Sequence, residues 1–327
     1  MRAPKPANET LDFQEILYIS MPYRTDRQDA LALLAAETGL RLTMIPGIST
    51  DDMSEKGLPV TNNPTHDPHW PWVGIWRAHA NAWRYIIDND LGSTLILEDD
   101  VDWDVYIKDV MGLLNWQMRY NNTIPRHGRR GEKESRVSDC AYGCDYWDTM
   151  FVGQCQNSAH PDDLRHMTYH DPYSPAVKDT GFVGELKDHW NLTEEDASVR
   201  VLAPTFNPLC LQAYALSNLG ARRALYQIGG FHSIHTAVDV EMIEHLESGQ
   251  LAGYTVTPPP FVKWGVHGRG ETDNFYQHFE DQLEEEKDKD LDRSMAGGWS
   301  SGLMTSARKA LGVLGAPARE WEGVTSR

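Results

Sequence analysis

The chain has 327 residues, of which 40% are hydrophobic and 10% aromatic, including 11 Trp. This is enough apolar material for a sizeable core, and it excludes a wholly disordered protein. The 48 acidic residues outnumber the 30 basic ones and give a formal net charge of −18. We therefore expect neither nucleic acid nor an anionic membrane as a partner, because both would be repelled. No run approaches the ~18 apolar residues of a membrane-spanning helix, so the chain as written is expected to be soluble.

The first part of the chain predicts strands and helices in alternation, from hydrophobic period and from Gly and Pro punctuation. The predicted strands are Ile16 to Ser20, Leu40 to Ile45 and Thr94 to Leu97, and the predicted helices are one closed by Gly39, then Ile75 to Asn89 and Tyr106 to Tyr120. Residues 49 to 73 have no period and are predicted to be loop.

The second part continues the alternation around a long irregular insert. The predicted strands are Thr149 to Val152, Leu209 to Leu216 and Tyr254 to Thr257, and the predicted helices are one capped by Ser217 or Asn218 and one from Val240 to Ser248. We expect an irregular insert over 160–186. The pattern predicts an α/β fold with an open, mostly parallel central sheet flanked by helices. We divide the chain into an N-terminal extension (1–13), a single domain (14–280) and an acidic, then Gly/Ser-rich peripheral tail (281–327).

The four cysteines leave the redox state open. Cys140, Cys144 and Cys155 crowd into one stretch and Cys210 follows later, a spacing that does not fit the paired C-x2-C of a zinc ribbon. Disulfides are expected in a secreted chain and free thiols in a cytosolic one, and we favour at least one disulfide. The compartment is left open, with the lumen of the secretory pathway as the alternative if an N-terminal anchor is missing from this sequence.

One acidic cluster stands out from the rest of the sequence. The segment LILEDDVDWD places five carboxylates directly after an apolar strand: Glu98, Asp99, Asp100, Asp102 and Asp104. In open α/β sheets, ligands bind beyond the carboxyl ends of the strands. Like charges packed at such a place are costly unless a cation lies among them.

Three interpretations of the cluster compete. A calcium loop that starts at Asp100 would need Gly where Val105 stands and Glu where Met111 stands, so that pattern fails. A solvated acidic turn that favours the N-terminus of the next helix through Asp102 or Asp104 is the structural alternative. We prefer a metal–diphosphate site, in which Glu98 and Asp100 hold Mn²⁺ or Mg²⁺ against a nucleotide sugar.

Here the sequence resembles a known family. The ILEDDV segment is similar to the acidic motif of glycosyltransferase family 25, which includes lipopolysaccharide and procollagen galactosyltransferases. Four further stretches follow in the family's order: YISMPYRTDR, GIWRAHANAW, AYALSNLGARRAL and TAVDVEM. The sequence departs from the family pattern at Ser20, Ala78 and Ala237, where Asn, Ser and Pro are usual. YWDTMFVGQC most resembles the fungal branch, and the resemblance covers roughly residues 14 to 275.

The resemblance implies a GT-A-like fold, a nucleoside-diphosphate sugar donor, usually UDP-linked, and dependence on Mn²⁺. It implies transfer of a galactose- or glucose-type sugar, with inversion, to a hydroxyl group of a glycan or protein acceptor. A metal on Asp100 and Glu98 would neutralise the leaving diphosphate. Enzymes of this fold often complete the metal shell with a late residue, and His267 is the candidate.

The remaining candidate residues follow from what such a reaction needs. Arg24 and Arg27 are predicted to bind nucleotide or phosphate together with Glu98 and Asp99, and the alternative for the arginines is an ordinary solvated helix start.

An inverting displacement also needs a base on the acceptor hydroxyl. Asp239 is the first candidate and Glu241 the second; the alternative for Asp239 is a helix N-cap. His79 is expected to be a hydrogen-bonded core histidine.

Two other functions stay open from the sequence. A metal-dependent phosphoesterase also uses clustered carboxylates. A catalytically inactive carbohydrate-binding protein on the same fold is credible because of the departures at Ser20, Ala78 and Ala237.

Overall fold

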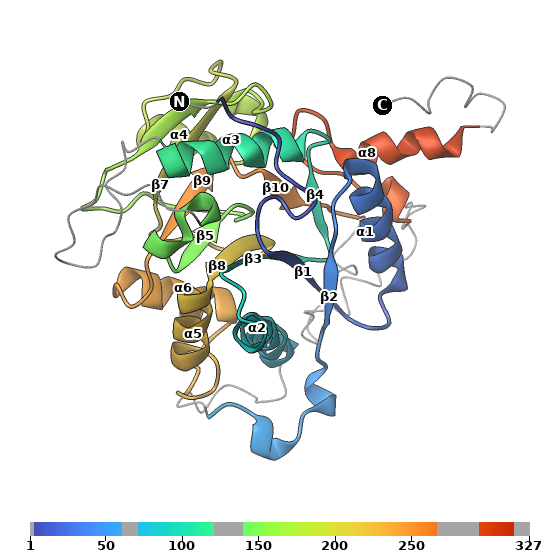
Figure 1. Ribbon diagram of the computed structural model, residues 1–327, viewed down its shortest axis with the longest axis vertical. Helices are drawn as coiled ribbons and strands as arrows, with labels where there is room; N and C mark the ends of the chain where they lie inside the picture. The colour runs from blue at the N-terminus through green and yellow to red at the C-terminus, as the bar shows by residue number, and fades with distance from the viewer. Residues whose placement is uncertain (1–2, 61–70, 121–139, 267–293, 317–327) are drawn as a thin grey trace, which may run out of the picture.

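The computed structural model describes residues 3–60, 71–120, 140–266 and 294–316, and it shows a central sheet with helices on both faces (Figure 1). The strands of this sheet are β1 (Glu15–Ser20), β2 (Thr43–Pro46), β3 (Ser93–Glu98), β5 (Thr149–Phe151), β6 (Met167–His170), β7 (Val199–Pro204), β8 (Ala213–Ser217) and β9 (Gly253–Thr257). The described helices are α1 (Thr25–Thr38), α2 (Pro71–Asp88), α3 (Ile107–Tyr120), α4 (Val183–Asp188), α5 (Asn218–Gln227), α6 (Val238–Glu247) and α8 (Ala307–Ala310). A separate two-stranded ribbon pairs β4 (Val101–Trp103) with β10 (Phe261–Lys263).

The sheet is open and has the strand order β2-β1-β3-β8-β5-β9-β7-β6. β1 pairs in parallel with β2 and β3, and β5 pairs in parallel with β9. β8 runs against β3 and β5, and β7 runs against β9 and β6. Two of the eight described strands are therefore reversed, and the other six share one direction. The predicted α/β class with an open, mostly parallel sheet is confirmed in strand direction, and the architecture is consistent with the GT-A-like fold that the resemblance implies.

Alternating side chains on each strand supply two apolar layers, one on each face of the sheet. On β3, Leu95 and Leu97 belong to the cluster that includes α1 and α3, whereas Ile96 belongs to the cluster that includes α2, α5 and α6. This alternation has the period of two that a strand imposes. Because both faces are covered, β3 is buried along its length up to its last residue, Glu98. The first charged side chain of β3, Glu98, thus lies at the carboxyl edge of the sheet.

The segments that we set apart at both ends of the chain pack against the domain. Leu11 and Phe13 are buried in the main core, so the described part of the N-terminal extension is structural. In the C-terminal tail, Ala307 is fully buried and Arg308 is 7% exposed. The expectation that the tail is peripheral is therefore wrong for its described residues, because α8 packs on β4. The exact division of the chain stays a prediction.

Most predicted elements are present within a few residues of their expected bounds. The helix expected to close at Gly39 ends there, and Gly39 adopts a left-handed conformation (φ 63°) whose N–H caps the carbonyls of α1. The insert expected over 160–186 is less irregular than predicted, because it contains β6 and the start of α4. β7 and β4 were not predicted. β4 is hidden in the acidic run, since Asp102 interrupts Val101 and Trp103.

The cysteines form two disulfides, Cys140–Cys144 and Cys155–Cys210, so the expectation of at least one disulfide is confirmed. No helix in the described part of the chain has the length and apolar character needed to cross a bilayer.

Candidate active site

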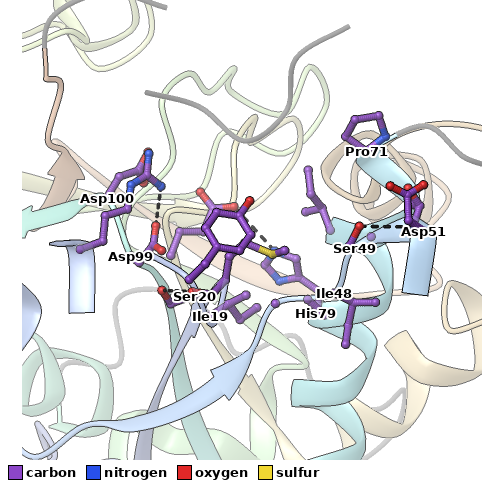
Figure 2. Close-up of a pocket in the computed structure, with 18 of the residues that line it drawn as sticks. Ile19, Ser20, Ile48, Ser49, Asp51, Pro71, His79, Asp99 and Asp100 are labelled. Carbon is purple, nitrogen blue, oxygen red and sulfur yellow. Dashed lines mark hydrogen bonds and ion pairs between the residues drawn. The ribbon is translucent and has the colours of Figure 1, made fainter. Parts of the chain in front are cut away.

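A cavity of about 370 Å³ opens at the carboxyl ends of β1 and β3. Its walls come from the end of β1, the loop after β2, the first turns of α2, the acidic turn after β3, and Lys263 at the end of β10. Figure 2 shows Ser20 and Asp99 on one side of this cavity and Ser49, Asp51 and Pro71 on the other. The location follows from the parallel arrangement, because the carboxyl ends of neighbouring parallel strands meet at one edge of the sheet.

The helix α2 approaches this edge closely because of a glycine. A Cβ atom on Gly74 would lie 2.2 Å from the carbonyl oxygen of Ile48, closer than side chains tolerate. Gly74 therefore permits the backbone of α2 to lie against the loop after β2. Both Ile48 and Gly74 line the cavity.

Arg27 and Asp99 form a buried ion pair in the cavity wall. Arg27 Nη1 lies 2.6 Å from Asp99 Oδ1, and the two residues are 8% and 6% exposed. Burial raises the pKa of Asp99, while the charge of Arg27 and hydrogen bonds from Ser20 and Arg27 oppose that rise. The structure thus brings together two residues predicted to bind nucleotide, but as partners of each other. Their role toward a nucleotide stays a prediction.

Arg24 is placed differently from Arg27. Its guanidinium donates two hydrogen bonds to the carboxylate of Asp26 at the start of α1, and Arg24 is not among the residues that line the cavity. The Arg24 side chain is 13% exposed, so it is not the solvated helix start of the alternative, and its binding to a nucleotide stays a prediction.

Asp100 presents a buried carboxylate oxygen that lacks a hydrogen-bond partner. Its side chain is 14% exposed, and Oδ1 accepts no hydrogen bond from the described residues. Oδ2 lies 3.6 Å from Lys263 Nζ. Burial, followed by repulsion from the neighbouring Glu98 carboxylate, raises the pKa of Asp100 to about 6. A buried carboxylate whose Oδ1 has no partner among the described residues, and whose Oδ2 has only the ion pair with Lys263, is costly unless a further cation binds it.

These carboxylates fit a site for a hard divalent cation whose remaining ligands would come from the substrate and water. Mg²⁺-type sites commonly use one or two protein carboxylates, with phosphate oxygens and water as the other ligands. Glu98 and Asp100 supply two carboxylates at one wall. Within the described residues, no group of three or more His, Cys, Asp or Glu side chains could hold a metal by itself. The predicted third ligand, His267, lies outside the described residues.

The backbone of the acidic turn is held from behind by two residues that sequence reasoning missed. Arg308 donates from Nη2 to the carbonyl of Asp99 (3.2 Å) and from Nε to that of Val101 (2.9 Å). The N–H of Trp264 donates to the carbonyl of Asp100 at 2.6 Å. Three successive carbonyls are thus fixed, which orients the Asp100 side chain toward the cavity. Burial lowers the pKa of Arg308 to about 10, against the pull of the nearby aspartates.

The last two aspartates of the cluster are structural. Asp102 is fully buried and accepts hydrogen bonds from the hydroxyl groups of Ser300 and Ser306. Asp104 accepts from the N–H groups of Tyr106 and Thr305, so it joins the turn before α3 to the C-terminal segment. Asp104 is buried rather than solvated, and its two N–H donors lie outside α3, so the solvated-turn alternative does not describe it; Glu98 and Asp100 face the cavity.

His79 lies in the cavity wall with one ring nitrogen in use. Nδ1 is 2.9 Å from the hydroxyl of Tyr214, which also accepts a hydrogen bond from Trp83 Nε1. Nε2 has no hydrogen-bond partner among the described residues and lies 3.7 Å from Glu98 Oε1. In the tautomer that uses every donor, Tyr214 donates to Nδ1 and the imidazole proton sits on Nε2, toward Glu98. His79 is therefore buried as expected, but only one of its two ring nitrogens has a hydrogen-bond partner among the described residues.

A second cavity of about 310 Å³ adjoins the first and shares Ile75, Glu98 and Lys263 with it. Asp239 lies in its wall, within the first turn of α6, where Ala237 is the N-cap residue. The N-cap alternative for Asp239 is therefore wrong. Its carboxylate accepts hydrogen bonds from the N–H groups of Cys210 and Val240, at 3.3 and 3.0 Å.

Glu241 has a different environment from Asp239. It is 3% exposed and its Oε1 accepts from the N–H groups of His235 and Thr236, which fixes the loop before α6. Glu241 is not among the residues that line either cavity. Of the two candidate bases, Asp239 is the one that the structure brings to a cavity beside Glu98.

The Cys155–Cys210 disulfide supports the wall of the second cavity. Cys210 lines the cavity and donates its N–H to Asp239. Leu209 and Gln156 form a bridge beside the disulfide, and Glu98 donates its N–H to the carbonyl of Gln212. One cross-linked segment thus contacts both Asp239 and Glu98.

Comparison with known proteins finds relatives that are named as glycosyltransferases. No family model matches the chain. A glycosyltransferase 25 family member of Drosophila melanogaster is 27% identical over 114 residues, which is 32% of this chain and 19% of the relative. Procollagen galactosyltransferase 1 of Danio rerio is 22% identical over 211 residues (57% of this chain, 35% of the relative). Procollagen galactosyltransferase 2 of Homo sapiens is 21% identical over 208 residues (56% and 33%).

The chain thus spans well under two thirds of the length of the curated relatives that it matches. The similarity is low in identity but points to one family in each case. The resemblance to glycosyltransferase family 25 that the motifs predict is therefore confirmed.

Proposed function

We propose that the chain is a hexosyltransferase that moves a galactose- or glucose-type sugar from a nucleoside-diphosphate donor, usually UDP-linked, to a hydroxyl group of a glycan or protein. One observation carries the proposal. The buried Asp100 carboxylate has an oxygen without a hydrogen-bond partner among the described residues, and it lies beside Glu98 where two cavities meet. A transferase needs such a junction, because donor and acceptor must meet at the reacting carbon.

The first cavity is the proposed donor side. Asp100 and Glu98 would hold Mn²⁺ or Mg²⁺, which supplies neutralisation of the charge that develops on the leaving diphosphate. The Arg27–Asp99 pair and Ser20 form a fixed polar wall where the nucleotide would lie. Because Arg308 and Trp264 fix the turn from behind, the carboxylates are positioned before the donor binds, which limits the reorganisation needed during reaction.

The second cavity is the proposed acceptor side. Asp239 is the proposed base, which takes the proton of the acceptor hydroxyl as its oxygen attacks the anomeric carbon from the face opposite the diphosphate. Hydrogen bonds from the Cys210 and Val240 N–H groups orient this carboxylate. Attack opposite the leaving group inverts the configuration at that carbon.

A screen of UDP-sugar donors that measures released UDP tests the proposal. We expect turnover with at least one hexose donor in the presence of Mn²⁺. Asp100→Asn should abolish donor hydrolysis and transfer, and Asp239→Asn should reduce transfer by about 10²–10⁴-fold, the usual contribution of a general base. Asp88→Asn, on the exposed face of α2, is the matched control and should change neither.

The same screen separates the alternatives. UDP or glycan binding without turnover would favour a catalytically inactive carbohydrate-binding protein. Turnover of simple phosphate esters but no UDP-sugar would favour a phosphoesterase. Full activity in Asp100→Asn would show that the metal, if one is used, binds elsewhere.

A further inference from the structure

Lys263 is held at the junction of the two cavities by a rigid backbone. It is the last residue of β10, where it pairs opposite Val101 of β4. The next residue, Trp264, donates its N–H to the Asp100 carbonyl. Phe261, two residues earlier in β10, is fully buried in the core. The Lys263 backbone is therefore fixed directly beside the acidic turn, from strand pairing on one side and the turn on the other.

The ammonium group of Lys263 forms an ion pair with Asp100 but no hydrogen bond within the described residues. The side chain is 55% exposed, and Nζ lies 3.6 Å from Asp100 Oδ2, which is longer than a hydrogen bond. Nζ makes no hydrogen bond in the part of the chain that the structure describes. The two neighbouring guanidiniums differ: Arg27 hydrogen-bonds Asp99, and Arg308 hydrogen-bonds backbone carbonyls behind the turn. Lys263 thus has donors available to a ligand.

The net charge of the first cavity indicates which kind of ligand Lys263 would bind. Its lining includes four carboxylates and two cations, a formal net charge of −2: Asp51, Glu98, Asp99 and Asp100 against Arg27 and Lys263. Without Lys263 the lining would carry −3, which a divalent cation alone does not cancel, and the diphosphate adds a charge that rises to about −3 as the sugar departs. An ammonium at the wall where the two cavities meet is placed to meet that charge.

We propose that Lys263 is a catalytic residue that binds the terminal phosphate of the nucleoside diphosphate donor; this inference rests on the proposed function. In the reaction, the bond between the anomeric carbon and the phosphate oxygen breaks, and its electron pair stays on that oxygen. The acceptor oxygen forms the new bond to carbon, and its proton passes to Asp239. Lys263 transfers no proton. Its N–H groups donate hydrogen bonds to the phosphate oxygens, and these hydrogen bonds strengthen as negative charge develops on the oxygens.

A structural role as counter-ion to Asp100 is the competing explanation. If Lys263 only neutralised Asp100, its removal would alter the stability of the protein or its metal binding. At saturating metal, the presence of a terminal phosphate on the ligand would then make no difference. A direct phosphate contact instead predicts a loss confined to ligands that carry the terminal phosphate. The two explanations therefore differ in ligand dependence.

Calorimetric titration with Mn²⁺ alone, and then with UDP, UMP and uridine at saturating Mn²⁺, separates them, because a counter-ion role alters Mn²⁺ binding whereas a phosphate contact weakens UDP binding with Mn²⁺ binding unchanged. We expect Lys263→Ala to weaken UDP binding by about 10- to 100-fold, the range of a charge-assisted hydrogen bond, and to leave uridine and UMP binding within about twofold of the unmodified protein. Lys263→Arg should retain part of the UDP affinity. Lys187→Ala, an exposed lysine paired with Glu194, is the matched control and should bind all three ligands normally.

The outcomes are distinguishable from failure of the proposed function. If the unmodified protein binds UDP and Lys263→Ala binds it equally well, or loses all three ligands alike, the assignment of Lys263 is overturned while the proposed function stands. If the unmodified protein itself does not bind UDP, both are overturned.

Discussion

Replacing Asp100 with Asn should stabilise the metal-free protein while it removes the proposed function. The pKa of Asp100 is raised from 3.8 to about 6, first by burial and then by Glu98. A carboxyl group with a raised pKa favours the protonated form in the folded state. Its favourable contribution is complete below about pH 3.8 and is lost as the pH rises through 6. A shift of about two units corresponds to about 3 kcal/mol at neutral pH.

Urea denaturation in EDTA at pH values from 4 to 8 measures this cost. Near pH 4 we expect Asp100→Asn and the unmodified protein to have similar free energies of unfolding. By pH 7.5 the variant should be the more stable one by up to about 3 kcal/mol, because the amide has no charge to bury. Asp88→Asn, in which the replaced carboxylate is 59% exposed, is the control and should show no such trend.

Two results would refute this reasoning. One is an Asp100→Asn variant that is no more stable than the unmodified protein at pH 7.5. The other is a stability difference that does not shrink toward pH 4. With Mn²⁺ and UDP present the order should reverse, because Asn lacks the carboxylate that would hold the metal. The buried Asp100 carboxylate would thus lower the free energy of unfolding in the metal-free protein and raise it when metal and UDP are bound.

Two further changes test the supports of the site. Arg308→Ala should lower the free energy of unfolding by about 3 kcal/mol, because two buried carbonyls lose their donors. The control is Arg41→Ala, which removes an exposed ion pair with Glu9 and should cost at most about 1 kcal/mol. Equal losses of the two variants in chemical denaturation would contradict a role of Arg308 in holding the acidic turn. Replacing Cys155 and Cys210 together by Ala should lower kcat for transfer, because the Cys210 N–H orients the proposed base Asp239. The same double replacement in the other disulfide is the control, and an equal loss of kcat in both variants would count against a specific role.

The parts of the fold and site that sequence predicts well are those set by local pattern. The strand before the acidic cluster is a continuous apolar run, and the change to Glu98 marks where burial ends. Those two signals locate the carboxyl edge of the sheet. Glu98 and Asp100, two residues apart, are the carboxylates that we then expect at that edge. The helix closed by Gly39 was likewise predictable, because its left-handed cap is a property of one residue type.

The remaining parts depend on contacts between residues far apart in the chain. Arg308 reaches the acidic turn from more than two hundred residues away, out of a segment whose composition suggested a peripheral tail. Lys263 joins the site because β10 pairs with β4, a strand that the acidic run concealed. His79 was correctly expected on the buried side of its helix, but whether its second nitrogen met a partner or a cavity could not be read from periodicity. The alternation of Val101 and Trp103 with Asp102 was the one available signal for β4.

The most direct test of the account is a thermal shift measurement of the unmodified protein with UDP, with and without Mn²⁺. We predict that UDP and Mn²⁺ together raise the melting temperature more than either alone, by an amount equivalent to about 2.7 kcal/mol when the ligand is at a hundred times its Kd. Asp100→Asn should lose this increment. No stabilisation by UDP, with or without Mn²⁺, would contradict the claim that this cavity binds a nucleoside diphosphate.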